Sequence, residues 1–335
     1  MNGITIDTVE RVVADQAPGS SARSLMNDLP GRVGLVVPTL NAGSDFDLWL
    51  AALQSQSLQP EYVLVVDSES SDDTVSRALK GGLTVHSIGR CEFTHGGTRQ
   101  DAINRLSGAD FVLFLTQDAF LADRRSLQCL LQAFRDPKVA VAYGRQLPQP
   151  GADPIEAHAR HFNYPAASYV RSAKDIAACG IKTSFVSNSF AAWRRAALQE
   201  IGGFAIDTIQ SEDTYAASKL VMAGWKIAYC AEATVYHSHH YCWRQEFSRY
   251  FDTGVFHARQ RWIRDSFGQV EGEGLRFAKS ELDYLVGTKP HLIGAALVRT
   301  GLKWIGFKLG NFERFLPIGL KRLLSMNKQF WQGNV

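Results

Sequence analysis

Two carboxylates in this sequence follow short apolar runs, at the points where strands would end. Asp118 comes three residues after the run Phe111–Leu115, and Asp67 directly follows the run at residues 62–66. A short apolar run bounded by polar residues is typical of a strand buried on both faces, and open α/β sheets bind ligands at the carboxyl ends of their strands. A carboxylate there, together with a diphosphate, provides the oxygen ligands that a hard divalent cation needs. Asp118 is therefore a candidate metal ligand, and a solvated loop acid is the alternative.

Asp67 stands in the sequence Val-Val-Asp-Ser, where its carboxylate can accept a hydrogen bond from N3–H of a uracil or thymine ring. The alternative is an Asp that stabilises a turn, and the residue alone favours neither. Asp67, Asp118 and the loop at His95 all follow strands of one expected sheet, which strengthens the ligand-binding interpretation.

A predicted helix opens with His95-Gly96-Gly97-Thr98-Arg99, a composition typical of an anion-binding loop. Glycines let backbone N–H groups approach a phosphate, and Arg99 would lie in the first turn, where the helix N-terminus favours negative charge. His95 and Arg99 are thus candidates to contact the phosphate or the sugar of a ligand. A plain Gly-Gly helix start is the alternative, since neither GxxxxGK[ST] nor GxGxxG is present.

Another predicted helix opens with Glu212 and Asp213. One of these carboxylates could act as a general base, because a cleft would raise its pKa toward the working range. Acids in the first turn of a helix also compensate the helix dipole, which is the structural alternative.

His237 follows a predicted short strand and precedes Ser238, His239 and His240. If the strand continues, His237 and His239 share one face, and one of them could bind a cation together with Asp118. A loop or core histidine is the alternative, and no HExxH pattern supports zinc. Trp193 could stack on a sugar face or lie in the core.

The elements that would carry these residues alternate between strand and helix. We expect strands at residues 33–37, 62–66, 83–88, 111–115 and 139–143, and helices at 47–56, 75–79, from 95, and at 127–134. This alternation over the first 145 residues predicts a right-handed, parallel α/β sheet. Beyond residue 143 the pattern loosens, with strands expected at 185–193, 226–229 and 234–236 and helices at 194–201 and from 212.

Residues 291–331 carry seven basic side chains against one acid, Glu313, with Leu, Ile, Phe and Trp between them. This pattern is typical of an amphipathic segment that lies on an anionic membrane surface. An equal alternative is a helix whose apolar face packs on the main domain.

The composition is that of an ordinary globular protein, with 335 residues, 45% hydrophobic and 21% charged. A net charge of +3 gives no indication of a nucleic-acid partner. The five cysteines form no CxxC pair, so we expect free thiols in a reducing compartment. Neither a signal peptide nor a membrane-spanning helix is expected, because no apolar stretch is long and uncharged enough.

Taken in order, several motifs resemble those of one known family. They are VVPTLNAG, VVDSESSDDT, FTHGGTRQDA, FLTQDAF, AVAYGRQLP, FNYP, SNSFAAWRRAAL, GGF, SEDTYAA, KIAY and VYHSHHY followed by QEFSRYFDTGVFH. The set resembles family 2 glycosyltransferases and, more narrowly, the bacterial rhamnosyltransferases of cell-surface polysaccharide assembly. It covers about residues 33–260, and an ordered set is far more specific than a single motif.

The resemblance implies a GT-A fold, which is a Rossmann-like, mostly parallel sheet with helices on both faces, followed here by a C-terminal helical extension. It implies a donor, dTDP-L-rhamnose in this branch, a Mg²⁺ or Mn²⁺ ion, and inverting transfer to a cell-surface polysaccharide or lipid-linked oligosaccharide acceptor. The QxxRW motif of processive synthases is not found after Asp213, so transfer of a single sugar is expected.

For the donor, the resemblance implies that Pro38 and Thr39 line the nucleoside pocket and that Asp67 holds the base. Gln117 replaces the first Asp of the DxD-type motif and is assigned to the nucleotide-sugar. Asp118 then remains as the metal-binding acid of that motif.

For the rest of the site, the resemblance implies that His237 completes the metal site and that Asp213 is the general base. Glu212, next to this base, is assigned together with Trp193 to the acceptor or the sugar.

Two other functions stay open at this point. A sugar nucleotidyltransferase shares a nucleotide-binding α/β sheet, but PTLNAGSD lacks the basic Gly-rich loop typical of that class. A non-catalytic nucleotide-sugar-binding module would keep the pocket, and the presence of Asp118 and Asp213 argues against it.

We expect three parts in the chain: a leader at residues 1–30, the GT-A domain at 31–245 and a basic, amphipathic helical extension at 246–335. The expected location is cytoplasmic, with peripheral contact to the inner face of the cytoplasmic membrane through residues 291–331.

Overall fold

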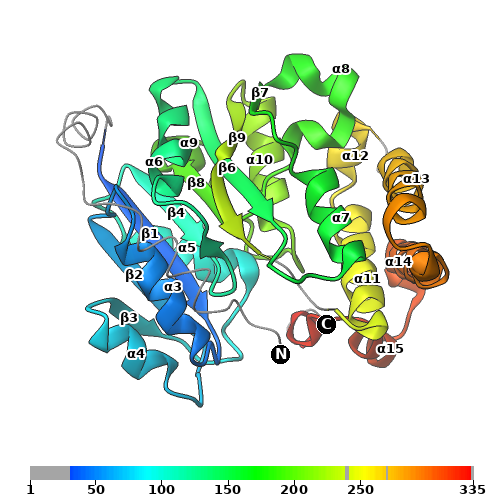
Figure 1. Cartoon of the computed structure of the whole chain (residues 1–335), viewed down its shortest axis with the longest axis horizontal. Helices are drawn as coiled ribbons and strands as arrows, with labels where there is room; N and C mark the ends of the chain where they lie inside the picture. The colour runs from blue at the N-terminus through cyan, green and yellow to red at the C-terminus, as the bar shows by residue number, and fades with distance from the viewer. Residues whose placement is uncertain (1–30, 238–240, 269–270, 333–335) are drawn as a thin grey trace.

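The computed structural model describes residues 31–237, 241–268 and 271–332, so the expected leader, residues 1–30, lies outside the described residues, as do His239 and His240. The described strands form one mixed sheet in the order β3-β2-β1-β4-β8-β6-β9-β5, with β7 paired to β9. Figure 1 shows the first strands and their helices at one end of the molecule and the C-terminal helices at the other.

The first half of the sheet is parallel, as the sequence predicts. β1 pairs with β2 and β4, and β2 pairs with β3, all in parallel. The elements are β1 (Val33–Thr39), α3 (Asp45–Gln54), β2 (Tyr62–Asp67), α4 (Thr74–Lys80), β3 (Thr84–Ser87), α5 (His95–Arg105) and β4 (Phe111–Leu115). Carboxyl ends of parallel strands meet at one edge, so the residues after β1, β2 and β4 lie along the same edge of the sheet.

The second half of the sheet is mixed. β8 runs antiparallel between β4 and β6, and β6 pairs in parallel with β9. The elements are β5 (Phe120–Leu121), α6 (Ser126–Leu131), η2 (Gln132–Arg135), β6 (Val139–Leu147), α7 (Pro154–Asn163), β7 (Tyr169–Arg171), η3 (Ala173–Asp175), α8 (Ile176–Cys179), η4 (Gly180–Ser184), β8 (Phe190–Arg194), α9 (Arg195–Glu200), α10 (Glu212–Met222) and β9 (Lys226–Tyr236). Because β8 is antiparallel, its first residues lie at the same edge as the last residues of β4.

Two sequence expectations in this half are wrong. The strands expected at 226–229 and 234–236 are one strand, β9, in which the pairing register with β6 shifts between Gly144 and Arg145. Residues 231–233, Ala-Glu-Ala, bulge out of this pairing, and Ala and Glu are uncommon in strands, which is why the sequence reads as two strands. The strand expected at 185–193 begins only at Phe190, and residues 187–189 form a loop that carries site residues.

The core lies on both faces of the sheet, and β4 contributes to each. Val112 and Phe114 pack into the cluster on one face, and Phe111, Leu113 and Leu115 pack into the cluster on the other. All five side chains are buried. Burial of each large apolar side chain stabilises the fold by about 1.5–3 kcal/mol. The strand is therefore held firmly, and it fixes the position of the residues that follow it.

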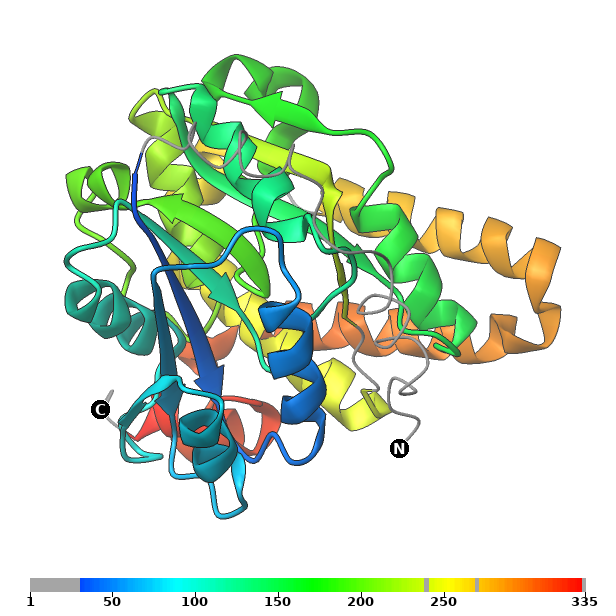
Figure 2. The same cartoon turned by 60° about the vertical axis from the view of Figure 1, so that its left-hand side comes forward.

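A layer of helices follows the sheet: α11 (Trp243–Arg259), α12 (Arg261–Phe267), α13 (Glu271–Thr288), η5 (Pro290–Leu292), α14 (Ile293–Asn311), η6 (Glu313–Phe315), α15 (Ile318–Leu324) and η7 (Lys328–Trp331). Figure 2 shows α13 and α14 extending beyond the sheet as a pair. No helix among the described residues is long and apolar enough to cross a membrane.

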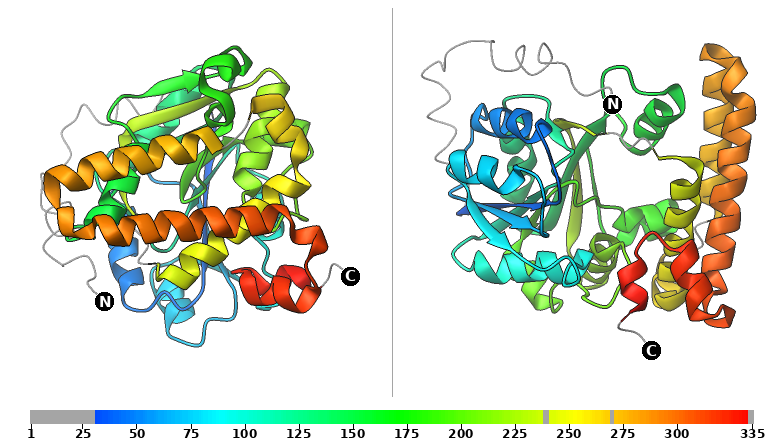
Figure 3. Two further views of the ribbon diagram at one scale, coloured as in Figure 1. Left: turned by 90° about the vertical axis from the view of Figure 1, so that its right-hand side faces the viewer. Right: turned by 90° about the horizontal axis from the view of Figure 1, so that it is seen from below.

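The helices α11 and α14 cross in close contact, as Figure 3 shows. A Cβ added at Gly310 would lie 2.1 Å from the Phe251 carbonyl oxygen, and one at Gly254 would lie 2.2 Å from the Phe307 carbonyl oxygen. Only glycine allows backbones to approach this closely. One face of α14 is therefore packed against the rest of the molecule, which is one of the two alternatives that the sequence left open.

Apolar side chains are also exposed along the C-terminal segment. Arg299 and Lys303 turn inward, where both contact Glu246. The exposed apolar side chains are Leu297, Val298, Trp304, Ile305, Phe312, Phe315, Ile318, Leu320, Leu323 and Met326. We call these ten side chains the outer face.

Candidate active site

The loops after β1 and β2 are held together by hydrogen bonds at the carboxyl edge of the sheet. The main-chain N–H of Asn41 donates to Ser70 Oγ, that of Ala42 to Thr74 Oγ1, and that of Ser71 to Asn41 Oδ1. Asn41 has a left-handed backbone, with φ 48°. Asn tolerates this conformation, and here the hydrogen bonds to Ser70 and Ser71 hold it.

Asp67 ends β2 inside this framework. Its carboxylate accepts from Thr39 Oγ1 at 2.9 Å, from Ser70 Oγ at 2.6 Å and from the Ser70 N–H at 2.9 Å. A carboxylate offers about four acceptor positions, so a position for one further donor, such as a ring N–H, is left. Pro38 and Thr39 are the last residues of β1, and Thr39 pairs with Asp67 in the parallel ladder.

Gln117 links the loop after β1 to the end of β4. Its side-chain oxygen accepts from the Leu40 N–H at 2.8 Å, and its side-chain nitrogen donates to the Leu40 carbonyl at 3.1 Å. Both ends of the amide are thus used on the protein backbone. Gln117 therefore fixes the loop after β1 relative to Asp118. Its amide is oriented by the backbone of Leu40 and not toward a ligand.

Asp118 and His237 lie next to each other. Asp118 Oδ1 is 3.4 Å from His237 Nε2, and the side chain of Asp118 is 42% exposed whereas that of His237 is 3% exposed. The pair forms because β5 and β9 are antiparallel, with Phe120 opposite Tyr236.

This pair fits a divalent cation. Neighbouring ligands of an octahedral ion with bonds of about 2.1 Å lie about 3 Å apart, close to the spacing of these two atoms. Among the described residues, no group of three or more His, Cys, Asp or Glu side chains could hold a metal. Two protein ligands leave the other coordination positions to phosphate oxygens and water, as is usual for Mg²⁺ at nucleotide sites.

Gln146, near the end of β6, contacts the buried side of His237. Gln146 Oε1 lies 2.8 Å from His237 Nδ1 and 2.7 Å from Arg160 Nη1, and its Nε2 donates to Ser187 Oγ at 3.0 Å. These contacts connect the His237 ring to the loop before β8.

That loop leads to the two acids that open α10. Asn188 donates its main-chain N–H to Asp213 Oδ2 at 3.1 Å and its side-chain amide to Glu212 Oε1 at 3.0 Å. Asp213 Oδ1 accepts from the Thr214 N–H at 2.7 Å. Ser211, just before α10, has a left-handed backbone with φ 61°, so the entry to this helix is strained.

The two neighbouring acids differ in their pKa. Burial, together with the negative charge of Glu212, raises the pKa of Asp213 to about 7. Burial opposes ionisation of Glu212 as well, but the Arg99 guanidinium and the Asn188 amide hold the pKa of Glu212 below its ordinary value. A carboxylate that titrates near neutral pH suits a general base. Asp213 therefore has the properties of the base, and Glu212 those of a fixed anion.

Arg99 and His95 lie behind this pair of acids. Arg99 Nη1 is 3.2 Å from Glu212 Oε1 with both side chains buried, and it donates to the His95 carbonyl at 3.0 Å. Burial lowers the pKa of His95, which favours a neutral ring. In the structure Arg99 thus binds Glu212.

The two glycines of this loop are explained by packing. A Cβ at Gly96 would lie 1.8 Å from the Ala205 carbonyl oxygen, and the Gly97 N–H donates to Thr94 Oγ1, the N-cap of α5. These contacts agree with the plain helix start that the sequence offered as the alternative to an anion-binding loop.

Trp193 does not lie at the surface. It is fully buried in β8, packs edge to face on Phe204 and donates its ring N–H to Asn188 Oδ1 at 2.8 Å. Stacking of Trp193 on a sugar is therefore wrong, and the core alternative is right. Its contribution to the site is to orient Asn188.

Five of the predicted site residues belong to one continuous set of contacts along the sheet edge: Asp67, Gln117, Asp118, His237 and Asp213. Asp67 joins the loop after β1, Gln117 joins this loop to Asp118, and Asp118 contacts His237. Gln146 contacts His237 and also Ser187, in the loop before β8. Asn188 of the same loop donates its main-chain N–H to Asp213.

Three residues of this set were missed by the sequence analysis: Gln146, Arg160 and Asn188. Gln146 stood beyond residue 143, where the alternation of strand and helix loosens, and Asn188 stood in a stretch interpreted as a strand. A signal for Asn188 was available, because Ser-Asn-Ser before an apolar run is typical of a loop and not of a buried strand.

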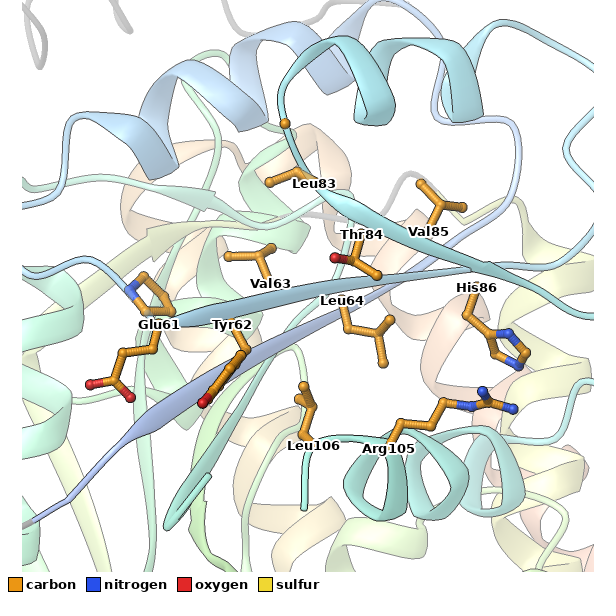
Figure 4. A pocket seen from close by; sticks show the side chains of 12 residues that line it. Glu61, Tyr62, Val63, Leu64, Leu83, Thr84, Val85, His86, Arg105 and Leu106 are labelled. Atoms are coloured by element: carbon orange, nitrogen blue, oxygen red, sulfur yellow. The ribbon is translucent and has the colours of Figure 1, made fainter. Parts of the chain in front are cut away.

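A separate cavity lies away from these residues. It has a volume of about 580 Å³ and is lined by residues of β2, β3 and the end of α5, among them Tyr62, His86 and Arg105. Figure 4 shows these side chains around the edge strands of the sheet. None of the predicted site residues lines it.

Comparisons with known proteins agree with this geometry. The family model described as glycosyltransferase like family 2 matches residues 30–264. The O-antigen chain rhamnosyltransferase RfbN of Salmonella typhimurium is 47% identical over 302 residues, which cover 90% of this chain and 96% of that protein. The O-antigen chain rhamnosyltransferase WbaN of Salmonella anatum is 47% identical over 298 residues, covering 89% of this chain and 95% of that protein.

Solved structures support the fold. A mannosyltransferase from Pyrobaculum calidifontis, solved with GDP-Man and Mn²⁺, superposes with a TM-score of 0.59 at 18% identity and covers 88% of this chain and 94% of that one. Residues 1–349 of S. aureus TarS superpose with a TM-score of 0.51 at 17% identity, covering 88% of this chain and 83% of that one.

Proposed function

The chain belongs to glycosyltransferase family 2, whose members transfer sugars with inversion, and on this premise we propose that it moves L-rhamnose from dTDP-L-rhamnose to a growing O-antigen-type glycan on a lipid-linked acceptor. Identity of 47% to two O-antigen rhamnosyltransferases over most of both chains supports the sugar and the acceptor class. The observation that carries the chemistry is Asp213, with its raised pKa, connected through Asn188 to the edge where Asp118 and His237 meet.

In the proposed reaction Asp213 takes the proton from an acceptor hydroxyl. The hydroxyl oxygen then forms a bond to the anomeric carbon while the bond from that carbon to the diphosphate oxygen breaks on the opposite face, which inverts the configuration. The electron pair of the broken bond leaves with the nucleoside diphosphate. A base poised near neutral pH accelerates such a step by a factor of roughly 10² to 10⁴.

For the donor, Thr39 and Asp67 would receive the base, since Asp67 keeps one acceptor position for a ring N–H. A divalent ion, Mg²⁺ or Mn²⁺, held by Asp118 and His237 would neutralise negative charge on the diphosphate. Gln117 would act through the loop after β1, because its amide is bound to Leu40. Arg99 would act through Glu212, and His95, whose carbonyl accepts a hydrogen bond from Arg99, would act through the same contact.

The donor is tested by incubating the protein with a panel of dTDP-, UDP- and GDP-sugars and a lipid-linked glycan acceptor, with Mg²⁺, Mn²⁺ or EDTA. We expect transfer from dTDP-L-rhamnose that requires the metal and releases dTDP. Transfer from another donor in preference would contradict the rhamnose assignment. Formation of a nucleotide-sugar from a sugar phosphate would contradict transferase chemistry altogether.

The outer face supports a second part of the proposal, which is contact with an anionic membrane surface. Its ten exposed apolar side chains lie on or beside α14 and α15, and the exposed Arg314, Arg322 and Lys328 lie among them. Apolar side chains flanked by cations are the combination that binds to anionic lipid. A lipid-linked acceptor would be presented at such a surface.

Deletion of this segment is a poor test, because Trp331 is buried and the Met326 and Asn327 N–H groups donate to Asp252. Substitution at the surface avoids this difficulty. Trp304→Glu with Phe315→Glu should release the protein from vesicles that contain phosphatidylglycerol, whereas Leu79→Glu, at an exposed apolar residue of α4, should not. Sedimentation of the double variant with the vesicles as in the unmodified protein would contradict the membrane contact.

A further inference from the structure

Gln146 is a buried side chain whose contacts fix the state of another residue. It is 2% exposed. Its Oε1 is 2.7 Å from Arg160 Nη1 and 2.8 Å from His237 Nδ1, while its Nε2 is 3.0 Å from Ser187 Oγ. An amide can be turned by 180° without changing its shape, so the orientation must be decided by its partners.

Arg160 decides it. A guanidinium nitrogen can only donate, so the atom of Gln146 that faces Arg160 must be the carbonyl oxygen. Ser187 is compatible with either orientation, because a hydroxyl both donates and accepts. The oxygen of Gln146 is therefore fixed between Arg160 and His237.

The oxygen in turn decides the tautomer of His237. A carbonyl oxygen can only accept, so Nδ1 of His237 must carry a proton. When the ring is neutral, Nδ1 carries its single proton and Nε2 keeps a lone pair. Nε2 is the atom that lies 3.4 Å from Asp118 Oδ1.

In this tautomer Nε2 is the ring atom that can act as a metal ligand, and it lies beside the Asp118 carboxylate. We propose that Gln146 and Arg160 are positioning residues, which hold His237 in the tautomer whose Nε2 can bind a divalent ion together with Asp118. The ion itself rests on the proposed function, but the tautomer does not. Hydrogen-bond partners of this kind orient ligating histidines and raise metal affinity, and their loss typically weakens binding 10- to 100-fold.

The first measurement uses the full-length, metal-free protein. Nitrogen-15 NMR of the histidine rings, with His237 assigned by comparison with a His237→Gln variant, distinguishes the two neutral tautomers. We expect the proton on Nδ1 in the unmodified protein. Gln146→Met removes the acceptor at similar length and should give a mixture, whereas Gln146→Glu keeps an acceptor and should preserve the tautomer.

The second measurement is Mn²⁺ affinity by electron paramagnetic resonance in the presence of dTDP. Gln146→Met should weaken binding roughly 10- to 100-fold, and Gln146→Glu should stay within a few-fold of the unmodified protein. Gln54→Met, an identical change at an exposed position of α3, is the matched control and should leave affinity unchanged. Thermal unfolding of each variant shows whether it is folded.

A third variant tests the role of Arg160 separately. In Arg160→Met the amide of Gln146 is free to turn, so its nitrogen can donate to Nδ1 and shift the proton to Nε2. We expect a partial change of tautomer and an intermediate loss of Mn²⁺ affinity.

A proton on Nε2 in the neutral ring of the unmodified protein would overturn the inference, and so would unchanged tautomer and affinity in a folded Gln146→Met variant. A failure of the proposed function is distinguishable from both results. If dTDP-L-rhamnose is not the donor, the tautomer and its response to Gln146→Met are still expected.

Discussion

Two buried acids of this molecule, one at the sheet edge and one in the C-terminal layer, have pKa values that are shifted in opposite directions. At the sheet edge, Asp213 lies beside a second acid, Glu212, and burial with that neighbouring charge raises the pKa of Asp213 to about 7. In the C-terminal layer, Glu313 lies between Arg259 at 3.0 Å and Lys321 at 2.6 Å. Burial opposes ionisation there too, but the two cations hold the pKa of Glu313 below its ordinary value.

The difference separates an acid that can exchange a proton from one that cannot. Glu313 stays charged at neutral pH and joins α11 to the segment around α15, and Glu246 is similarly placed between Arg299 and Lys303. The main-chain N–H groups of Asn188 and Thr214 hold the Asp213 carboxylate in position. With a pKa of about 7, this carboxylate can gain and lose a proton near neutral pH. Burial and the neighbouring charge of Glu212 bring the pKa of Asp213 to about 7, which is the range that a general base needs.

The strongest test of this comparison removes one acid from each region. Asp213→Asn should lower kcat by a factor of roughly 10² to 10⁴ while donor binding survives, because the variant cannot accept the proton. Glu313→Gln should leave kcat unchanged and lower the free energy of unfolding by about 1–3 kcal/mol. Turnover is measured by dTDP release and stability by denaturant unfolding. Near-normal turnover of Asp213→Asn would remove this residue from the role of base.

A second test concerns Asp118, the exposed acid of the site. Asp118→Ala should abolish the metal-dependent part of donor binding, because the ion loses one of its two protein ligands. An ion contributes several kcal/mol at such a site, so affinity for dTDP in the presence of Mg²⁺ should fall roughly 100-fold. Calorimetry with Mg²⁺ and with EDTA measures this effect, and Asp265→Ala, at an exposed acid of α12, is the control. Equal affinity of the variant and the unmodified protein with Mg²⁺ would refute the ligand assignment.

The sequence predicted much of the fold, for a clear physical reason. Strands such as Phe111–Leu115 are buried on both faces and short, so hydrophobic pattern alone locates them. The bulge in β9 was not predictable, because it depends on pairing with β6 and not on local sequence. The sequence predicted a basic, amphipathic C-terminal segment. It did not predict that Arg299 turns inward, because that depends on the position of Glu246 in the fold.

At the site, the sequence predicted the residues at strand ends and missed those that orient them. Asp67, Asp118 and Asp213 stand where a motif or a strand end draws attention. Gln146 and Asn188 act through contacts to residues far away in the chain, such as Gln146 to His237 and Asn188 to Asp213. Trp193 was misassigned because an aromatic side chain near polar residues has the same local sequence whether it faces a ligand or the core.

A third test concerns the close contact between α11 and α14 in the C-terminal layer. Gly310→Ala places a Cβ against the Phe251 carbonyl oxygen and should destabilise the protein by about 1–3 kcal/mol, because two backbones must move apart. Gly301→Ala, on the same helix with open space around its Cβ position, should be stabilising by about 1 kcal/mol at most, from helix propensity. Thermal unfolding measures both variants. Equal stability of the two would show that the contact between α11 and α14 is not close.

A shift of the pH profile is the smallest expected effect, and it concerns Glu212 and Asp213 alone. The pKa of Asp213 is raised to about 7, so below that pH the base is protonated and kcat/KM should fall as pH is lowered. Glu212→Gln removes the neighbouring negative charge, which should lower the pKa of Asp213 and move the fall in kcat/KM to lower pH. Because this change leaves Arg99 without its acid, the double variant Glu212→Gln with Arg99→Met serves as the control and should shift the profile in the same direction. A profile that stays in place in both variants, with the proteins folded, would show that Glu212 does not set the charge state of Asp213.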